Sequence, residues 1–433
     1  MRARLVIAIL AAWMLASCDS PDSGDAQTTM SPDQSGDPTA YSDGSRVTAT
    51  SKTDFEMRPR PTDENDFPEY IQYLVDVAEP RTADERTADV DVKRKFRGAL
   101  VMDALFVGGP GFPAGFSDEQ YEEAVQHSID SQYDFISATI TNGPPEDTPD
   151  VVKERMARVN EYWKQQPERY VQVFDVDDIR KAVRQGKLAV MHNFQSMMPL
   201  GADPELEKTL ANLRTYHELG LRQMNFTYNI DTIYADGGVS NDDGIDQGVT
   251  DLGEAVIKEM NRLGIVVDCS HSSNKTCTEA AAITRKPMMM SHSNLMTYQP
   301  IGRNVSDEAI KAVAATGGVI CVNFIGGFLN PNGLARPYDI AKHVQYIRKL
   351  VGPEATCVGP DYVYNYADAL LWILRNPKDF PVEMGYATPS HMGKPGEIWG
   401  VVRELQDRYG WTDDEIRGFL GENLLRLYQA NWE

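Results

Sequence analysis

Eight short apolar runs recur along the chain, and longer amphipathic segments separate them. The runs cover residues 99–105, 133–140, 188–195, 221–229, 264–271, 287–294, 317–324 and 355–362. Each run is of strand length and mostly continuous rather than alternating, which is typical of parallel strands buried on both faces. Eight strand–helix units over roughly 270 residues favour an α/β fold of the (β/α)8 TIM-barrel type over an open doubly wound sheet.

Helix signals lie between and after these runs. Residues 204–219, 250–262 and 306–316 have amphipathic spacing, and Ser306 is a plausible first cap of the third segment. Near the C-terminus, residues 412–415 read as a capping box, and Gly421 interrupts the pattern that follows. We therefore predict a helical cap that closes the barrel, and one domain spanning residues 62–433.

The chain before the barrel pattern divides into two parts. Residues 1–18 have a charged start, an apolar stretch and a small-residue ending at Cys18, as in a secretory signal peptide. This ending resembles a bacterial lipobox, in which Cys18 carries the lipid; a plain secretory signal with a chance cysteine is the alternative. Residues 19–61 are polar and should form a disordered tether. We expect a protein lipid-anchored to a bacterial membrane, facing the periplasm or the outside.

Charge and cysteine content exclude some classes of protein. Lys and Arg number 42 against 64 Asp and Glu, a net charge of −22, which argues against nucleic acid as a partner. Five cysteines in 433 residues do not make a disulfide scaffold. Cys269, Cys321 and Cys357 lie in apolar runs, where we expect small buried hydrophobes. A Cys269–Cys277 pair is a less favoured alternative, because spacing alone does not establish disulfide geometry.

Chemistry in such a barrel belongs at the carboxyl ends of the strands. The residues expected there are Asp103, Ser137, Gln195, Tyr228, His271, His292, Asn323 and Asp361. Two consecutive strands end in histidine, in a chain with only seven histidines. Neutral imidazole is the commonest metal ligand, and Asp361 is placed to act as a general base. A structural, hydrogen-bonded role is the alternative for each histidine.

Several stretches resemble the membrane (renal) dipeptidase family. The densest match is residues 258–271, KEMNRLGIVVDCSH, preceded by LRTYHELGLR at 213–222 and followed by MSHS at 290–293 and GRNVSD at 302–307. GGVI at 317–320 and GENLLR at 421–426 extend the resemblance, which covers roughly residues 95–430. The family implies a zinc-dependent (β/α)8 barrel of the metal-dependent hydrolase kind, which cleaves dipeptides and is often attached to membranes.

The resemblance assigns roles to individual residues. It implies that His271 and His292 are metal ligands, that Arg303 holds substrate, and that Asp361 assists the chemistry. In the family, a His-x-Asp on the first strand and a bridging Glu on the third complete a dinuclear zinc site.

This chain departs from the family at other positions. Leu105 and Val107 stand where the His-x-Asp belongs, Gln195 replaces the bridging Glu, and Tyr228 replaces a histidine that faces the substrate. Leu and Val offer no ligand atom, and an amide is a poor zinc donor, so we expect one zinc ion at most. A third ligand would come from Gln195, Asp361 or Asp103, although Asp103 lies about 6.6 Å deeper in the barrel. His192 lies on the opposite strand face and should point into the helical layer.

Three hypotheses follow. The first is a hydrolase that cleaves dipeptides or related small amides by metal-activated water, with Tyr228 and Arg303 binding substrate. The second is a non-peptidase descendant that binds or transforms an amino-acid-derived molecule without dinuclear zinc, in which Arg303 grips a carboxylate. The third is a lipid-tethered scaffold. Tyr228 is equally consistent with a tyrosine that only closes the barrel rim. The sequence leaves the oligomeric state open, and a homo-oligomer is compatible with it.

Overall fold

A computed structural model describes residues 58–112, 117–201 and 205–432, all within one compact unit of the chain. Its parallel strands follow the order β1-β2-β4-β5-β6-β7-β8-β9, and β1 lies against β9, so the sheet is a nearly closed barrel. The strands are β1 (Met102–Phe106), β2 (Phe135–Thr141), β4 (Leu188–Phe194), β5 (Leu221–Asn225), β6 (Val266–Asp268), β7 (Met289–Met290), β8 (Val319–Val322) and β9 (Thr356–Val358). The predicted (β/α)8 barrel is confirmed.

Each of the eight apolar runs overlaps one barrel strand. β1 and β2 end one residue beyond their runs, whereas the other six barrel strands end before theirs do. β6 ends at Asp268, three residues before His271, and β9 ends three residues before Asp361. The chemical groups therefore belong to the loops that follow the strands. A further strand, β3 (Tyr170–Gln172), pairs only with β4 and was not predicted.

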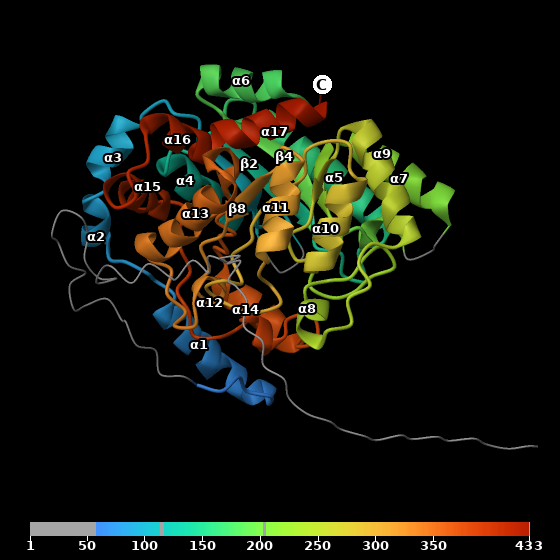
Figure 1. Cartoon of the computed structure of the whole chain (residues 1–433), viewed down its shortest axis with the longest axis horizontal. Helices are drawn as coiled ribbons and strands as arrows, with labels where there is room; N and C mark the ends of the chain where they lie inside the picture. Colours follow the sequence, from blue (N-terminus) through green and yellow to red (C-terminus); the bar gives the residue numbers. More distant parts are fainter. Residues whose placement is uncertain (1–57, 113–116, 202–204, 433) are drawn as a thin grey trace, which may run out of the picture. The chain divides into compact units, whose positions relative to one another are not determined.

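Helices surround the barrel (Figure 1). They are α4 (Asp118–Asp130), α5 (Pro149–Lys164), α6 (Val176–Gln185), α7 (Leu206–Glu218), α9 (Asp251–Leu263), α10 (Asn274–Ile283), α11 (Asp307–Ala315), α13 (Pro337–Val351) and α15 (Glu397–Asp407). The three predicted helical segments correspond to α7, α9 and α11. The Ser306 hydroxyl accepts the N–H of Ala309, so the predicted cap of α11 is confirmed.

The C-terminal segment closes the amino-terminal end of the barrel. It comprises α16 (Asp413–Arg417), the π-helical turn η5 (Gly418–Glu422) and α17 (Asn423–Trp432). The capping box at Thr412 and Glu415 is present, and the predicted break at Gly421 falls within the π-helical turn. Leu424 and Tyr428 of α17 pack with buried residues from the strands, among them Met289. Because this end is filled, ligands have access from the carboxyl ends of the strands.

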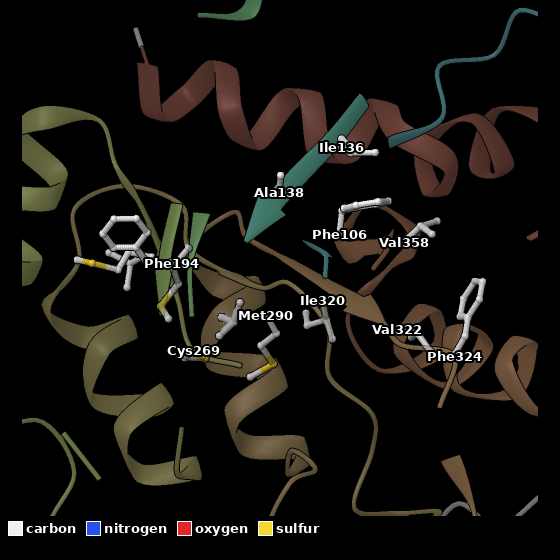
Figure 2. Close-up of a cluster of buried hydrophobic side chains, with 14 of the residues drawn as sticks. Phe106, Ile136, Ala138, Phe194, Cys269, Met290, Ile320, Val322, Phe324 and Val358 are labelled. Atoms are coloured by element: carbon white, nitrogen blue, oxygen red, sulfur yellow. The ribbon is translucent and has the colours of Figure 1, made fainter. Parts of the chain in front are cut away.

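The main core lies between the barrel and its helices. Figure 2 shows side chains such as Phe106, Ile136, Phe194 and Val358 from different strands gathered in one buried cluster. Residues from both sequence halves contribute to this cluster, which joins all the strands to the helical layer. The apolar faces that the sequence pattern predicted are therefore buried together, as expected for strands covered by helices.

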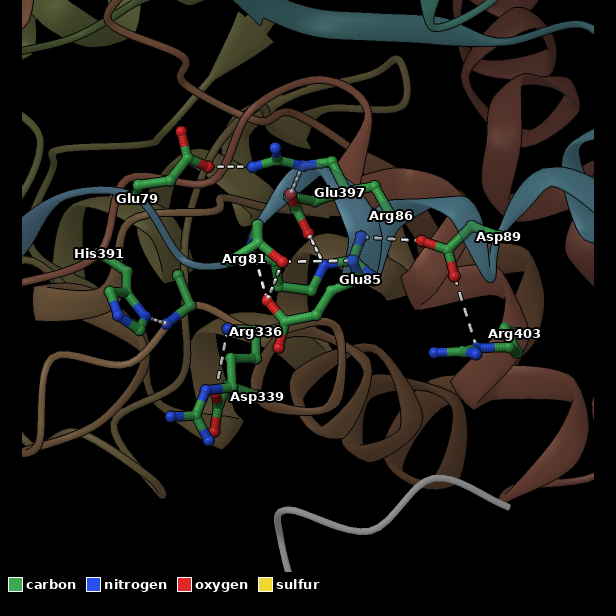
Figure 3. A network of polar contacts seen from close by, with 12 residues as sticks. Glu79, Arg81, Glu85, Arg86, Asp89, Arg336, Asp339, His391, Glu397 and Arg403 are labelled. Atoms are coloured by element: carbon green, nitrogen blue, oxygen red, sulfur yellow. Dashed lines mark hydrogen bonds and ion pairs between the residues drawn. The ribbon is translucent and has the colours of Figure 1, made fainter. Parts of the chain in front are cut away.

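The segment before the barrel is attached by a buried ion network. It contains α1 (Phe67–Val77), α2 (Ala83–Thr87) and α3 (Val90–Lys95). Arg81 is buried, with Nη2 2.8 Å from Asp89 and Nε 2.6 Å from Glu397 of α15. Arg86 approaches the other oxygen of Glu397 at 2.8 Å (Figure 3). One carboxylate thus joins two arginines and fixes α2 against α15.

Two disulfides correct the prediction of unpaired buried cysteines. Cys321 and Cys357 are register partners on the adjacent strands β8 and β9, and their side chains are bonded. Cys269 is bonded to Cys277, which was only the less favoured alternative. Cys18, the predicted lipidation site, lies outside the described residues. Within residues 58–112, 117–201 and 205–432, no helix is long and apolar enough to cross a bilayer.

Candidate active site

A cavity of about 100 Å³ lies at the carboxyl end of the barrel. Four of the predicted site residues line it: Gln195, Tyr228, His271 and Asp361. The rest of its wall is largely apolar and comes from the loops after β1, β8 and β9, and from α14 (Tyr366–Arg375). Parallel strands bring their carboxyl ends to one edge, which is why residues distant in sequence meet here.

The two histidines form a closed hydrogen-bond network. The Nε2 atoms of His271 and His292 lie 2.7 Å apart. The Asn229 amide group donates to the backbone oxygen of Asp379 at 2.8 Å, so its oxygen faces His271 Nδ1 at 2.7 Å. His271 Nδ1 must then carry the proton, and its Nε2 accepts from His292 Nε2–H. The Ser291 hydroxyl, 2.7 Å from His292 Nδ1, completes the chain as a donor.

A buried cation lies beside this pair. Arg303 is 2% exposed, its Nη2 lies 3.2 Å from His271 Nε2, and it also donates to the His292 carbonyl at 2.8 Å. Burial lowers the pKa of both imidazoles well below the ordinary histidine value, and the Arg303 charge lowers these pKa values further. Both rings are therefore neutral at pH 7, and the hydrogen bond between them requires that the accepting Nε2 of His271 carries no proton.

Asp361 lines the cavity near the same cation. Burial raises the pKa of the Asp361 carboxyl to about 7, and the positive charge of Arg303 opposes this rise. A carboxyl group with this pKa can accept or release a proton near neutral pH. This pKa is compatible with the general-base role of Asp361, which stays a prediction.

The backbone near the cavity is held in an unusual conformation. The backbone angle φ is +67° at His271 and +58° at Asp361. It is +65° at Asn229, whose side chain contacts His271. L-residues rarely adopt this left-handed region, and such residues cluster at functional sites. The sharp turns after β6 and β9 direct the imidazole and the carboxyl group into the barrel mouth.

The other predicted residues have defined contacts. The Tyr228 ring stacks on His271, with centroids 4.2 Å apart. Gln195 donates its amide N–H to Thr139 Oγ1 at 3.1 Å. His192 stacks on Trp163 of α5, which confirms its predicted place in the helical layer. Asp103 is buried and accepts the N–H of Leu105, and it is not among the cavity-lining residues.

Several contributors were not predicted from the sequence. Asn142 follows β2 and lines the cavity, and its place directly after a predicted strand was a usable signal. Asn229 orients His271, and the Tyr386 hydroxyl donates to the same Asn229 oxygen at 3.0 Å. Trp372 and Phe380 form an aromatic wall, with centroids 4.7 Å apart. Tyr386, Trp372 and Phe380 lie beyond the last strand, where the barrel pattern carries no signal.

The donors present do not fit the dinuclear zinc site of the resembled family. Leu105 and Val107 offer no ligand atom. Across the described ranges, no group of three His, Cys, Asp or Glu side chains is placed to hold a metal ion. Two nitrogens on one tetrahedral zinc lie about 3.3 Å apart, farther than the 2.7 Å between the imidazoles here. A single ion would have to break this hydrogen bond beside the positive charge of Arg303.

Comparison with solved structures supports the fold. An amidohydrolase from Pseudomonas aeruginosa matches with a TM-score of 0.67 and 22% identity, covering 79% of this chain and 99% of that one. The probable dipeptidase PvdM from the same organism matches with a TM-score of 0.62 and 20% identity, covering 81% and 99%. A metallo peptidase from Rhodobacter sphaeroides, liganded with a phosphinate mimic of L-Ala-D-Ala, gives 0.59 and 16%, covering 77% and 99%.

Sequence comparison identifies the family. An uncharacterized dipeptidase of Schizosaccharomyces pombe is 31% identical over 257 residues, 58% of this chain. The alignment spans 56% of that relative, so the chain covers just over half of its length. The family model described as membrane dipeptidase (peptidase family M19) matches residues 115–371, more than half of the chain. The chain therefore belongs to the membrane dipeptidase family.

Proposed function

We propose that this dipeptidase-like hydrolase acts on a dipeptide or similar small amide with a free carboxylate, without a dinuclear zinc site. The observation that carries the proposal is the buried and incompletely hydrogen-bonded guanidinium of Arg303. Its Nε and Nη1 atoms are buried and make no hydrogen bond of ordinary geometry within the described residues, and the Tyr386 hydroxyl lies near the guanidinium. A buried charge is costly unless it is paired, so a ligand carboxylate is the natural partner.

The surroundings of Arg303 support this role. Its guanidinium lies over the Phe328 ring, 5.3 Å from the centroid, and Phe328 lines the cavity. His271, which also lines the cavity, has its Nε2 atom 3.2 Å from Arg303 Nη2. We propose that a carboxylate entering past Phe328 reaches Nε and Nη1 of Arg303. The apolar wall then holds the ligand side chains, and the amides of Asn142 and Gln195 face its peptide group.

Asp361 supplies the proposed chemistry. Its ionised carboxylate removes a proton from water, and the water oxygen bonds to the amide carbon. The carbon–nitrogen bond then breaks, and the protonated Asp361 returns the proton to the departing amine. The pKa of about 7 makes both steps accessible at neutral pH.

A second candidate function is binding without hydrolysis. The residues that follow β1 and β4 favour binding without hydrolysis. Val107 and Gln195 line the cavity at positions where the resembled family has metal ligands. Both candidates use the same carboxylate contact at Arg303. They differ in whether the bound amide is cleaved.

We also propose that the chain is exported and anchored to a membrane through a lipid on Cys18. The signal-like residues 1–18 support this proposal. The two disulfides support it independently, because disulfides persist in oxidising compartments outside the cytosol.

Arg303→Met should weaken binding of L-Ala-D-Ala by about 10- to 100-fold, because a charge-assisted contact is lost. Calorimetry with the dipeptide and with its C-terminal carboxamide measures this. The carboxamide should bind weakly to both proteins. Arg94→Met, at an exposed ion pair, is the control. Equal affinity of Arg303→Met and wild type for the dipeptide would refute the carboxylate contact.

The value of kcat/KM for L-Ala-D-Ala should rise with pH around a midpoint of about 7 and then level off. The base is the ionised form of Asp361, whose pKa is raised, so activity is lost as pH falls below that value. Asp361→Asn should abolish hydrolysis, and with it the rise of kcat/KM with pH. Circular dichroism should show that the variant is folded. A pH-independent rate, or hydrolysis by the variant, contradicts this role. Binding of the dipeptide with no hydrolysis at any pH selects the second candidate.

Purified protein should contain one zinc ion per chain at most, measured by inductively coupled plasma mass spectrometry after gel filtration. The physical reason is the missing ligands at Leu105, Val107 and Gln195. Any zinc that is present should be lost in His271→Ala. Two zinc ions per chain would contradict the prediction that Leu105, Val107 and Gln195 exclude a dinuclear site.

Cys18→Ser should move the protein from the membrane pellet to the soluble fraction, because the attachment site of the lipid is removed. Fractionation of expressing cells followed by immunoblotting measures this. Mass spectrometry of the mature N-terminus identifies the lipid in the wild type. Retention of the variant in the pellet would reject the anchor at Cys18.

A further inference from the structure

The described part of the chain begins with a segment that lies against the cavity wall. We call residues 58–77, which include α1, the N-terminal strap. Arg60 donates through Nη1 to the backbone oxygen of Phe380 and through Nη2 to that of Ile373, both at 2.7 Å. Phe380 and Ile373 both line the cavity. One guanidinium therefore ties the end of α14 to the loop that follows it.

Tyr70 makes a second connection to the wall. Its hydroxyl donates to the backbone oxygen of Ala387 at 3.0 Å, and Ala387 also lines the cavity. Ala387 has a φ of +50°, a strained conformation for alanine. Such a conformation persists where the surrounding structure holds it in place. Tyr70 is one of the groups that hold it.

Apolar packing joins the two hydrogen-bonded points. Phe67 and Leu74 of α1 form a buried cluster with Leu370 and Leu374 of α14. Leu370 also lines the cavity, so α14 is packed between the ligand space and the strap. The wall formed by residues 366–387 contains α14 and a short turn, η4 (Val382–Met384), but no strand. Its position therefore depends on side-chain contacts rather than on the barrel sheet.

We infer that Arg60 and Tyr70 are positioning residues that fix the apolar wall of the cavity through three backbone carbonyls, and thereby set the affinity for the side chain of the ligand. This inference rests on the proposed function in so far as it concerns the ligand. Neither residue touches the histidine pair or Asp361 by any described hydrogen bond. Their loss should change binding of the ligand and leave the chemical step intact.

The test uses the full chain with Arg60→Ala, Tyr70→Phe and the double variant. Arg375→Ala is the matched control, because Arg375 also links α14 to the strap. Its ion pair with Glu64, at 3.4 Å, is exposed and reaches no wall carbonyl. Hydrogen–deuterium exchange of residues 366–387 should become about tenfold faster in the double variant. The exchange rate of α13 should stay unchanged in the double variant. In Arg375→Ala, the exchange rate of residues 366–387 should also stay unchanged.

Kinetics with L-Leu-L-Leu provide the second readout. KM should rise about fivefold or more in Arg60→Ala, with kcat unchanged, and Arg60→Lys should restore part of the affinity through one remaining hydrogen bond. Unchanged exchange in the wall, equally faster exchange in α13, or an unchanged KM would each overturn the inference. If the wild type neither binds nor cleaves dipeptides, the proposed function fails, and the exchange experiment alone decides the positioning role.

Discussion

The guanidinium of Arg303 is buried beside His271 and His292, and its charge affects every titratable group around it. It lowers the pKa of both imidazoles and opposes the rise in the pKa of Asp361. Neutral rings can share one proton between their facing nitrogens, whereas two charged rings would repel each other. The charge has strong effects because the three side chains are buried, where the effective dielectric constant is below that of water. Burial, and in addition this one cation, therefore keep the rings in the hydrogen-bond chain from Ser291 to Asn229 neutral.

The barrel was predictable because each of its strands overlaps a longer buried apolar run, even where the strand itself has only two or three residues. The features that were missed have little local signal. β3 has one strand partner, and two of its three residues are only partly buried, so it does not lie in a continuous apolar run. The Cys321–Cys357 bond joins residues 36 apart in sequence, and only the register of β8 and β9 brings them together. Cysteine spacing alone does not carry that information.

The candidate site was predictable to the extent that it follows the strand ends. His271, Tyr228, Gln195 and Asp361 meet at one cavity because parallel strands converge at that end of the barrel. Trp372, Phe380 and Tyr386 come from a segment without strands, and Arg60 comes from the opposite end of the chain. Their places are set by tertiary contacts, which a pattern of apolar spacing does not encode. The replacement of the family's ligands at the first and third strands, in contrast, is visible in the residue types Leu105, Val107 and Gln195, and the limit of one zinc ion stays a prediction.

The left-handed backbone at Asn229, His271 and Asp361 has a consequence for how such a barrel diverges. This conformation is least costly for Gly, Asn and Asp, and most costly for β-branched residues. Loss of a functional side chain at these positions can therefore pass through Asn or Gly with little harm to the fold. Substitutions that remove a reactive group at these positions therefore cost little folding stability. A barrel of this kind can lose one catalytic activity and keep its fold. The same positions can later accept side chains that support a different reaction.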